Sequence, residues 1–370
     1  MRKTTQKTYH YFTDAVFALT ILLIARVAPA QNLLYVGVSR AGSIDVITPA
    51  GVIQTNFITG LSLPTALAFN SVGNLFVADA NSGAIYEFTN YNGTLKTNIN
   101  FFASGLSSPY GLAFDSAGDL FEADLGSHTV NEFTNQNGIL NATRGAFASI
   151  PGSSPAGLAF DNKGDLFEAD YSGGKVNEFT NQNGTLNSAP GAFASGLESD
   201  GPDGLAFDTA GNLFVSIAAS AGMIIKITPN GTQSTFATYV TTLGLSNPLG
   251  VAFNSSGNLF VANEQASQSF GNIIQYVPDG GTNFFANGIP APTCVAFAPS
   301  IGLQMVATNQ PMYLNVSEPS PYYDTYTTII QASSNLMFWA DVYTNVPPFN
   351  FVDPSAPQMK SRFYRAHLVP

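Results

Sequence analysis

The chain is poor in charged residues and in cysteine. Charged residues make up 10% of its 370 residues, whereas a typical soluble domain has about 25%, and Cys294 is its single cysteine. One cysteine excludes an internal disulfide framework and a zinc site built from cysteines. The 13 basic and 24 acidic residues give a formal net charge of −11. Because nucleic-acid binding needs clustered Lys and Arg to neutralise phosphates, we expect no nucleic-acid partner.

Long apolar runs are also scarce, and the clearest one lies near the start. Residues 15–25 form an apolar run that follows a basic segment and precedes Ala-Pro-Ala at 28–30. This order is typical of a secretory signal peptide, and the run is shorter than the roughly 20 residues of a membrane span. We therefore predict a signal peptide at residues 1–30. An uncleaved anchor is the alternative, which Arg26 directly after the run leaves open.

Export would change the charge balance of the chain. Removal of residues 1–30 leaves 9 basic and 23 acidic residues, a net charge of −14. No run of 18 or more apolar residues follows it, so we expect no membrane span after cleavage. The expected product is a monomer that is secreted, periplasmic or held at the cell surface.

The middle of the chain repeats one phrase at intervals of 44–47 residues. A full copy reads PYGLAFDSAGDLFEAD, and the copies begin at Pro64, Pro109, Pro155, Pro202, Pro248 and, in shortened form, Pro292. The second copy has four strand signals, here named A to D, at residues 111–114, 120–123, 129–134 and 146–149. Turns with glycine separate A from B at 117–118 and C from D at 137–138. Four antiparallel strands in about 45 residues predict one blade of a β-propeller.

The two ends of the repeat region complement each other. Residues 292–298 supply only strand A of a sixth blade, whereas residues 33–60 align with strands B, C and D. We therefore predict an all-β, six-bladed propeller at residues 31–302 that the N-terminal strands close. Closure removes the open sheet edges that would otherwise aggregate.

The repeats resemble the NHL-repeat propellers and, more distantly, the SMP-30/gluconolactonase-like six-bladed propellers. The resemblance covers about residues 32–299 and rests on the Phe-Val-Ala-Asp end of strand B and on Pro-Asp-Gly-Leu-Ala-Phe-Asp at 202–208. It implies a fold that serves both enzymes and binding platforms.

The repeat stops at residue 303. Residues 303–370 hold six short β-like runs and the single tryptophan, Trp339, so we predict a small C-terminal β-sandwich. The segments IIQASSNLMFWADVYTN at 329–345, FNFVD at 349–353 and RFYRA at 362–366 resemble a C-terminal module of secreted bacterial proteins. The resemblance assigns the module no role, and our own hypothesis is surface attachment or spacing. The alternative for residues 303–308 is an extra strand on the sixth blade.

The residue after each repeat proline is expected near the axis, at the mouth of the central channel. These ring residues are Thr65, Tyr110, Ala156, Asp203, Leu249 and Thr293. The gluconolactonase-like resemblance implies Glu, Asn and Asp ligands for a divalent cation such as Ca²⁺, and only Asp203 matches. Hard cations need several oxygen ligands, so we assign no metal, cofactor or catalytic residue. Asp203 is a weak metal candidate, and we expect it to be solvated or to cap a turn.

Strand B carries extra carboxylates in two neighbouring blades. Glu122 and Glu168 stand where other blades have valine, and Asp124 and Asp170 follow two positions on. With Asp203 and the loop residues Glu198 and Asp200 they would form an acidic arc for a cation, a basic peptide or polar sugars. The alternative is structural: Asp79, Asp124 and Asp170 cap the B–C turns, and each Glu meets a hydroxyl or an amide. We favour capping for the Asp residues and leave both readings open for the Glu pair.

Other chemistry-bearing residues are isolated. His128 lies in a B–C turn and His367 near the C-terminus, so no Ser-His-Asp set can be assembled with assurance. Cys294 is expected to be a small buried residue.

The sequence therefore predicts an exported, noncatalytic binding or scaffolding propeller, with a protein, peptide or glycan as its ligand. The candidate contacts at the channel mouth are Thr65, Tyr110, Asp203, Thr293, Glu122, Glu168, Asp124 and Asp170. The alternative is a metal-dependent hydrolase or lactonase of the gluconolactonase-like type. A structural part of the cell surface is a third reading.

Overall fold

A computed structural model describes residues 33–91, 94–197, 201–218, 222–238, 244–265 and 270–299, together with the backbone of six strands between 302 and 369. The predicted signal peptide at 1–30 lies outside the described residues. Within them, the structure contains no helix that is long and apolar enough to cross a membrane.

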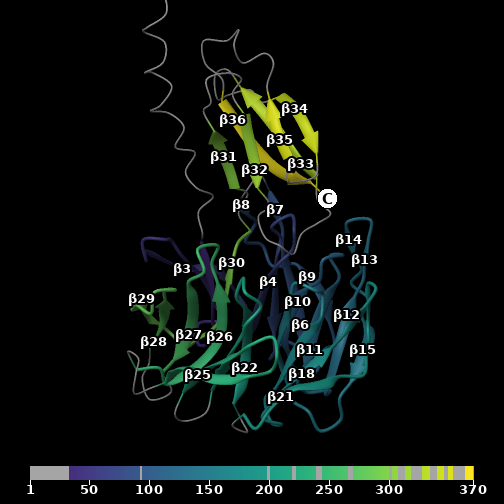
Figure 1. The fold of residues 1–370 in the computed structure, drawn as a ribbon, viewed down its shortest axis with the longest axis vertical. Helices are drawn as coiled ribbons and strands as arrows, with labels where there is room; N and C mark the ends of the chain where they lie inside the picture. The colour runs from purple at the N-terminus through teal and green to yellow at the C-terminus, as the bar shows by residue number, and fades with distance from the viewer. Residues whose placement is uncertain are drawn as a thin grey trace, which may run out of the picture.

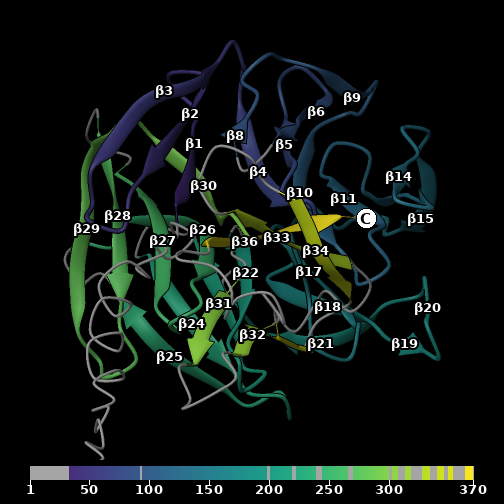
Figure 2. The ribbon, with the colours of Figure 1, turned by 90° about the horizontal axis from the view of Figure 1, so that it is seen from above.

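Six four-stranded antiparallel sheets surround a common axis (Figure 2). The innermost strands neighbour one another in the closed order β4, β10, β16, β22, β26 and β30. The blades, from strand A at the axis to strand D at the rim, are β4 (Pro64–Phe69), β5 (Leu75–Asp79), β6 (Ala84–Phe88) and β9 (Phe101–Ser104); β10 (Pro109–Phe114), β11 (Leu120–Asp124), β12 (Thr129–Phe133) and β15 (Gly145–Ser149); β16 (Pro155–Phe160), β17 (Leu166–Asp170), β18 (Lys175–Phe179) and β21 (Gly191–Ser195); β22 (Pro202–Phe207), β23 (Leu213–Ile217), β24 (Met223–Ile227) and β25 (Gln233–Thr238); β26 (Asn247–Phe253), β27 (Leu259–Glu264), β28 (Gly271–Tyr276) and β29 (Thr282–Ile289); and β30 (Pro292–Phe297), β1 (Leu34–Val38), β2 (Ser43–Ile47) and β3 (Ile53–Thr59). We number them blades 1 to 6 in this order.

Blade 6 joins the two ends of the repeat region. Strand β1 pairs antiparallel with β30, with Leu34 opposite Phe297 and Tyr35 opposite Ala296. The prediction that N-terminal strands close a six-bladed ring is confirmed. The extra-strand alternative for residues 303–308 is wrong, because β31 (Gly302–Val306) pairs with β32 (Tyr313–Ser317) and not with blade 6.

The repeated phenylalanines hold neighbouring blades together. The second residue of strand B packs edge-on against the last residue of strand A in the next blade, as Phe121 does against Phe160, with 5.4 Å between ring centroids. The same contact recurs between Phe167 and Phe207 and between Phe260 and Phe297. Such pairs each add about 0.5–1.5 kcal/mol beyond the burial of their area.

The glycine in strand A lets the inner strands approach one another closely. A Cβ atom on Gly157 would lie 2.1 Å from the carbonyl oxygen of Asp203 in the next blade. The equivalent distance from Gly111 to the carbonyl oxygen of Ala156 is 2.0 Å. Both separations are far too short for a side chain, so the Pro-x-Gly spacing encodes a narrow, tightly packed ring.

Blades 1 to 3 carry a small hairpin that the sequence analysis did not predict. The segment between strands C and D folds into the two-stranded pairs β7 (Asn90–Tyr91) with β8 (Thr94–Leu95), β13 (Asn135–Gln136) with β14 (Ile139–Leu140), and β19 (Asn181–Gln182) with β20 (Thr185–Leu186). The predicted turn at Asn137 and Gly138 is present, with φ of 54° and 83°, as a tight hairpin requires. It closes this separate hairpin rather than joining C to D.

Six further strands follow the propeller (Figure 1). Strand β32 pairs with β31 and β35 (Phe349–Val352), and β33 (Thr327–Ser333) pairs with β34 (Ala340–Asn345) and β36 (Phe363–Val369). The packing that would make these two sheets a sandwich, and Trp339, lie outside the residues whose side chains are described.

Candidate functional site

The two threonines of the ring donate hydrogen bonds to neighbouring blades of the ring. Thr65 donates a hydrogen bond from its hydroxyl to the carbonyl oxygen of Pro109 in the next blade at 2.8 Å. Thr293 donates to the carbonyl oxygen of Pro64 at 2.6 Å. Both hydroxyls therefore tie neighbouring blades together at the axis.

Asp203 and Tyr110 meet in the channel, although they belong to blades 4 and 2. The Tyr110 hydroxyl lies 3.4 Å from Asp203 Oδ2, and the corresponding ring residue of the blade between them is the small, fully buried Ala156. Asp203 is 6% exposed. Burial raises its pKa to about 7, and the hydrogen bond from Tyr110 lowers the pKa by a smaller amount. The expectation that Asp203 is solvated or caps a turn is therefore wrong.

The described ionisable groups next to Asp203 in the ring, Tyr110 and Cys294, are also acids. Two effects raise the pKa of Tyr110 well above its usual 10: the nearby Asp203 carboxylate, which is the larger effect, and burial. Cys294 is 5% exposed, as expected for a small buried residue, and burial raises the pKa of its thiol to about 12. All three groups are therefore biased toward their neutral forms.

This ring does not fit the divalent cation that the gluconolactonase-like resemblance implies. It offers one carboxyl group among Thr, Tyr, Ala and Leu, whereas Ca²⁺ takes about six to eight oxygen ligands. Across the described part of the chain, no three or more His, Cys, Asp or Glu side chains are grouped so that they could hold a metal.

Glu122 and Glu168 point between blades, and neither is exposed. Glu122 Oε2 accepts a hydrogen bond from Asn131 Nδ2 at 2.7 Å, and Glu168 Oε2 accepts one from Asn177 Nδ2 at 2.6 Å. Glu168 Oε1 also lies 3.5 Å from Ser153 Oγ. Burial raises the pKa values to about 8 for Glu122 and about 7 for Glu168, and the asparagine bonds lower them by less. These contacts match the structural alternative for the Glu pair, with the exception of Glu122 Oε1, which has no hydrogen-bond partner among the described residues.

The aspartates at the end of strand B are caps, as predicted. Asp124 Oδ1 accepts hydrogen bonds from the backbone N–H of Ser127 in the B–C turn at 3.1 Å and of Ser108 in the D–A loop at 2.9 Å. Asp79 and Asp170 accept equivalent bonds in blades 1 and 3. Each carboxylate therefore fastens two loops on one face of the disc.

The proposed acidic arc is not an exposed surface. Five of its carboxylates, at Glu122, Asp124, Glu168, Asp170 and Asp203, are at most 6% exposed. The other two, Glu198 and Asp200, lie outside the described residues.

His128 has a backbone conformation that the sequence analysis missed. Its φ is 59°, where the corresponding turns of blades 1 and 3 have Gly83 and Gly174 with φ of 60° and 58°. Its Nδ1 lies 2.5 Å from the carbonyl oxygen of Ser153. Because the ring reaches this carbonyl and not the Ser153 hydroxyl, the pair is not a nucleophile with its base.

A cavity of about 880 Å³ opens between blades 1 and 2. It lies on the face of the disc that carries the A–B turns, opposite the face with the mouth of the channel. Its walls are the A–B turns of both blades and the hairpin β13–β14, and its apolar side chains include Phe76, Phe102, Phe114 and Leu140. This volume lies within the range of about 300–1,000 Å³ for small-molecule sites. We call it the blade 1–2 cavity.

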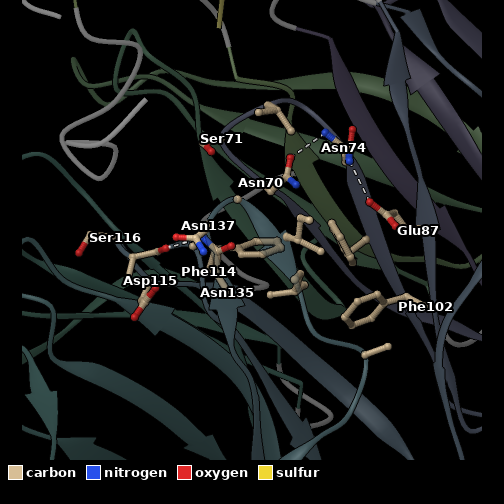
Figure 3. A pocket seen from close by; sticks show the side chains of 18 of the residues that line it. Asn70, Ser71, Asn74, Glu87, Phe102, Phe114, Asp115, Ser116, Asn135 and Asn137 are labelled. Atoms are coloured by element: carbon tan, nitrogen blue, oxygen red, sulfur yellow. Dashed lines mark hydrogen bonds between the residues drawn. The ribbon is translucent and has the colours of Figure 1, made fainter. Parts of the chain in front are cut away.

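Polar side chains gather on both walls of this cavity (Figure 3). On the blade 1 wall, Asn74 Nδ2 donates to Glu87 Oε1 at 2.8 Å, and Asn70 Oδ1 accepts from the Asn74 N–H at 2.8 Å. On the blade 2 wall, Asn135 Nδ2 donates to the carbonyl oxygen of Ala117 at 2.8 Å. Asp115 also lines this wall, and burial raises its pKa to about 6. These bonds hold amides and carboxylates in fixed positions around one space.

Sequence reasoning placed no site at this cavity. It arises where the A–B turns meet the unpredicted hairpins, so no single repeat contains it. The available signal was the Asn-Gly turn at residues 137–138, which marked a hairpin but not what the hairpin would cover.

Comparison with known proteins gives the fold alone. No family model and no curated protein sequence matches the chain. A chain in a nidogen/laminin complex is 18% identical, with a TM-score of 0.56 over 72% of this chain and 98% of that one. A Bacteroides caccae protein of unknown function is 15% identical, with a TM-score of 0.54 over 73% and 99%. A Xanthomonas campestris gluconolactonase is 17% identical, with a TM-score of 0.50 over 64% and 84%. These values show a shared propeller fold, and a shared fold does not by itself establish an activity.

Proposed function

We propose that the protein is an exported, noncatalytic binding propeller that holds its ligand in the blade 1–2 cavity. The observation that carries this proposal is the contrast between the two faces. The cavity combines space with polar groups from two blades, whereas Thr65, Thr293 and Asp203 at the channel mouth are engaged within the ring.

The proposal also includes export, an NHL-type propeller and a C-terminal module. The basic segment, apolar run and Ala-Pro-Ala of residues 1–30 support secretion to the periplasm, cell surface or medium. The repeated phrase supports an NHL-type propeller, and residues 303–370 support a C-terminal module for attachment or spacing. The partner would be a protein, peptide or glycan.

The gluconolactonase-like alternative rests on the fold and on Asp203. It requires a divalent cation at the channel, for which the ring offers one buried carboxyl group. Metal analysis and thermal shift with Ca²⁺, Mg²⁺, Mn²⁺ and Zn²⁺ test it. A stoichiometric metal that Asp203→Asn abolishes would replace our proposal with this alternative.

One matched pair of variants tests the site. Ala117→Lys places a lysine at the cavity wall, where the equivalent turn of blade 3 already has Lys163, so the fold should tolerate it. Ala210→Lys makes the same change in the equivalent turn of blade 4, whose residues do not line the cavity. Both alanines are exposed.

A glycan and peptide array gives the readout. We expect ligands of the wild-type protein to be lost with Ala117→Lys and retained with Ala210→Lys and Asp203→Asn. Loss with Asp203→Asn and retention with Ala117→Lys would move the site to the channel mouth and contradict the proposal.

A further inference from the structure

We propose that the blade 1–2 cavity recognises a neutral oligosaccharide. This inference rests on the proposed function and deepens it by naming the ligand class.

The charge of the cavity disfavours anions. None of the described residues that line it is Lys, Arg or His, and it has a carboxyl group on each wall, at Glu87 and Asp115. A phosphate or a uronic acid would meet like charge without a compensating cation. The ligand must therefore be neutral or basic.

The polar groups suit hydroxyls. Asparagine and carboxylate side chains each present more than one lone pair, and hydroxyls both donate and accept. The amide of Asn135 is held in place by its bond to the carbonyl oxygen of Ala117, and Asn70 and Asn74 are held by hydrogen bonds on the other wall. A sugar would therefore meet hydrogen-bonding side chains at fixed positions on both walls.

The apolar side of the cavity is held rigidly. Phe76 is 1% exposed and packs edge-on against Phe102 and Phe114, each with ring centroids 5.2 Å apart. Phe102 and Phe114 themselves are partly exposed. Fixed aromatic rings beside hydrogen-bonding amides match a sugar, which carries hydroxyls at its rim and C–H groups on the faces of its ring. Little side-chain entropy is lost on binding, because these rings are already held.

Isothermal titration separates the ligand classes. The probes are cellotetraose, xylotetraose, mannotetraose and chitotetraose as neutral sugars, tetragalacturonate as an anionic sugar, and tetralysine as a basic peptide. We expect at least one neutral sugar to bind the wild-type protein and Ala210→Lys equally, and Ala117→Lys at least about tenfold more weakly. Equal melting temperatures of the two variants confirm that both are folded.

The failing outcomes are distinct. If tetralysine binds in a manner sensitive to Ala117→Lys and no neutral sugar does, the sugar inference fails and the cavity remains the site. Tighter binding of tetragalacturonate than of every neutral sugar overturns the charge argument and with it the inference. If no probe binds in a manner sensitive to Ala117→Lys, the inference fails; if the ligands from the array are also insensitive, the proposed function fails.

Discussion

Glu122 occupies a strand B position where blades 1, 4 and 5 have Val77, Val215 and Val261. Its register partner on strand C is Asn131, whereas Val215 and Val261 have isoleucine partners. Blade 2, like blade 3 with Glu168 and Asn177, thus buries a polar pair where blades 4 and 5 bury an apolar one. The pair satisfies one carboxylate oxygen and leaves Glu122 Oε1 without a partner among the described residues.

The pKa of Glu122 gives its effect on stability a defined sign. Its value is about 8 in the folded protein against an ordinary 4.5, so the folded state retains a proton that the unfolded state releases. The contribution of this group is complete below about pH 4.5 and is lost as the pH rises through 8. The loss is on the order of a few kcal/mol.

We expect the double variant Glu122→Val with Asn131→Ile to be more stable than the wild-type protein at pH 9. Replacing both members of a buried polar pair by apolar residues is often neutral or stabilising. The difference in melting temperature should widen between pH 5 and pH 9, as measured by calorimetry. A difference that does not change with pH would show that Glu122 has an ordinary pKa.

The single change Glu122→Val is the control. It leaves the amide of the 5% exposed Asn131 without its carboxylate partner, so it should be less stable than the double variant at every pH.

The close packing of the inner strands depends on the glycine in strand A. We expect Gly157→Ala to destabilise the protein by about 1–3 kcal/mol, the cost of overpacking a filled core, because its Cβ would lie 2.1 Å from a carbonyl oxygen of blade 4. Gly191→Ala in β21 of the same blade is the control, since nothing lies within 4 Å of its Cβ position. Chemical denaturation measures both. Equal stability of the two variants would mean that the inner strands can separate without cost.

Strand assignment from sequence succeeded where pattern and packing agree. The predicted strand at residues 120–123 is β11 (Leu120–Asp124), because alternating apolar residues pack against both neighbouring blades. The hairpin β13–β14 was missed because its strands are two residues long and none of their residues is buried, so they carry no apolar pattern. The environment of Asp203 was missed because its hydrogen-bond partner, Tyr110, belongs to a different repeat.

Ring closure involves both ends of the repeat region, because β1 pairs with β30. It could be predicted because a partial repeat at each end adds up to one blade, a property of the entire chain. The blade 1–2 cavity could not, because its walls come from two repeats whose turns and hairpins meet only in the folded ring.

Closure through β1 predicts complementation by a peptide. A chain that begins at residue 39 lacks β1, which lies between β2 and β30, and should melt at a lower temperature than one that begins at residue 31. A peptide of residues 31–38 should restore the lost stability by strand addition, and a scrambled peptide should not. Equal melting temperatures without the peptide would contradict closure by this strand.

Hydrogen exchange of the wild-type protein, with and without its tightest-binding neutral tetrasaccharide, tests the site most directly. We predict slower exchange of backbone amides at residues 70–74, 115–119 and 135–140, which surround the blade 1–2 cavity. Slower exchange confined to residues 79–84 and 124–129, at the B–C turns on the opposite face, would contradict the account.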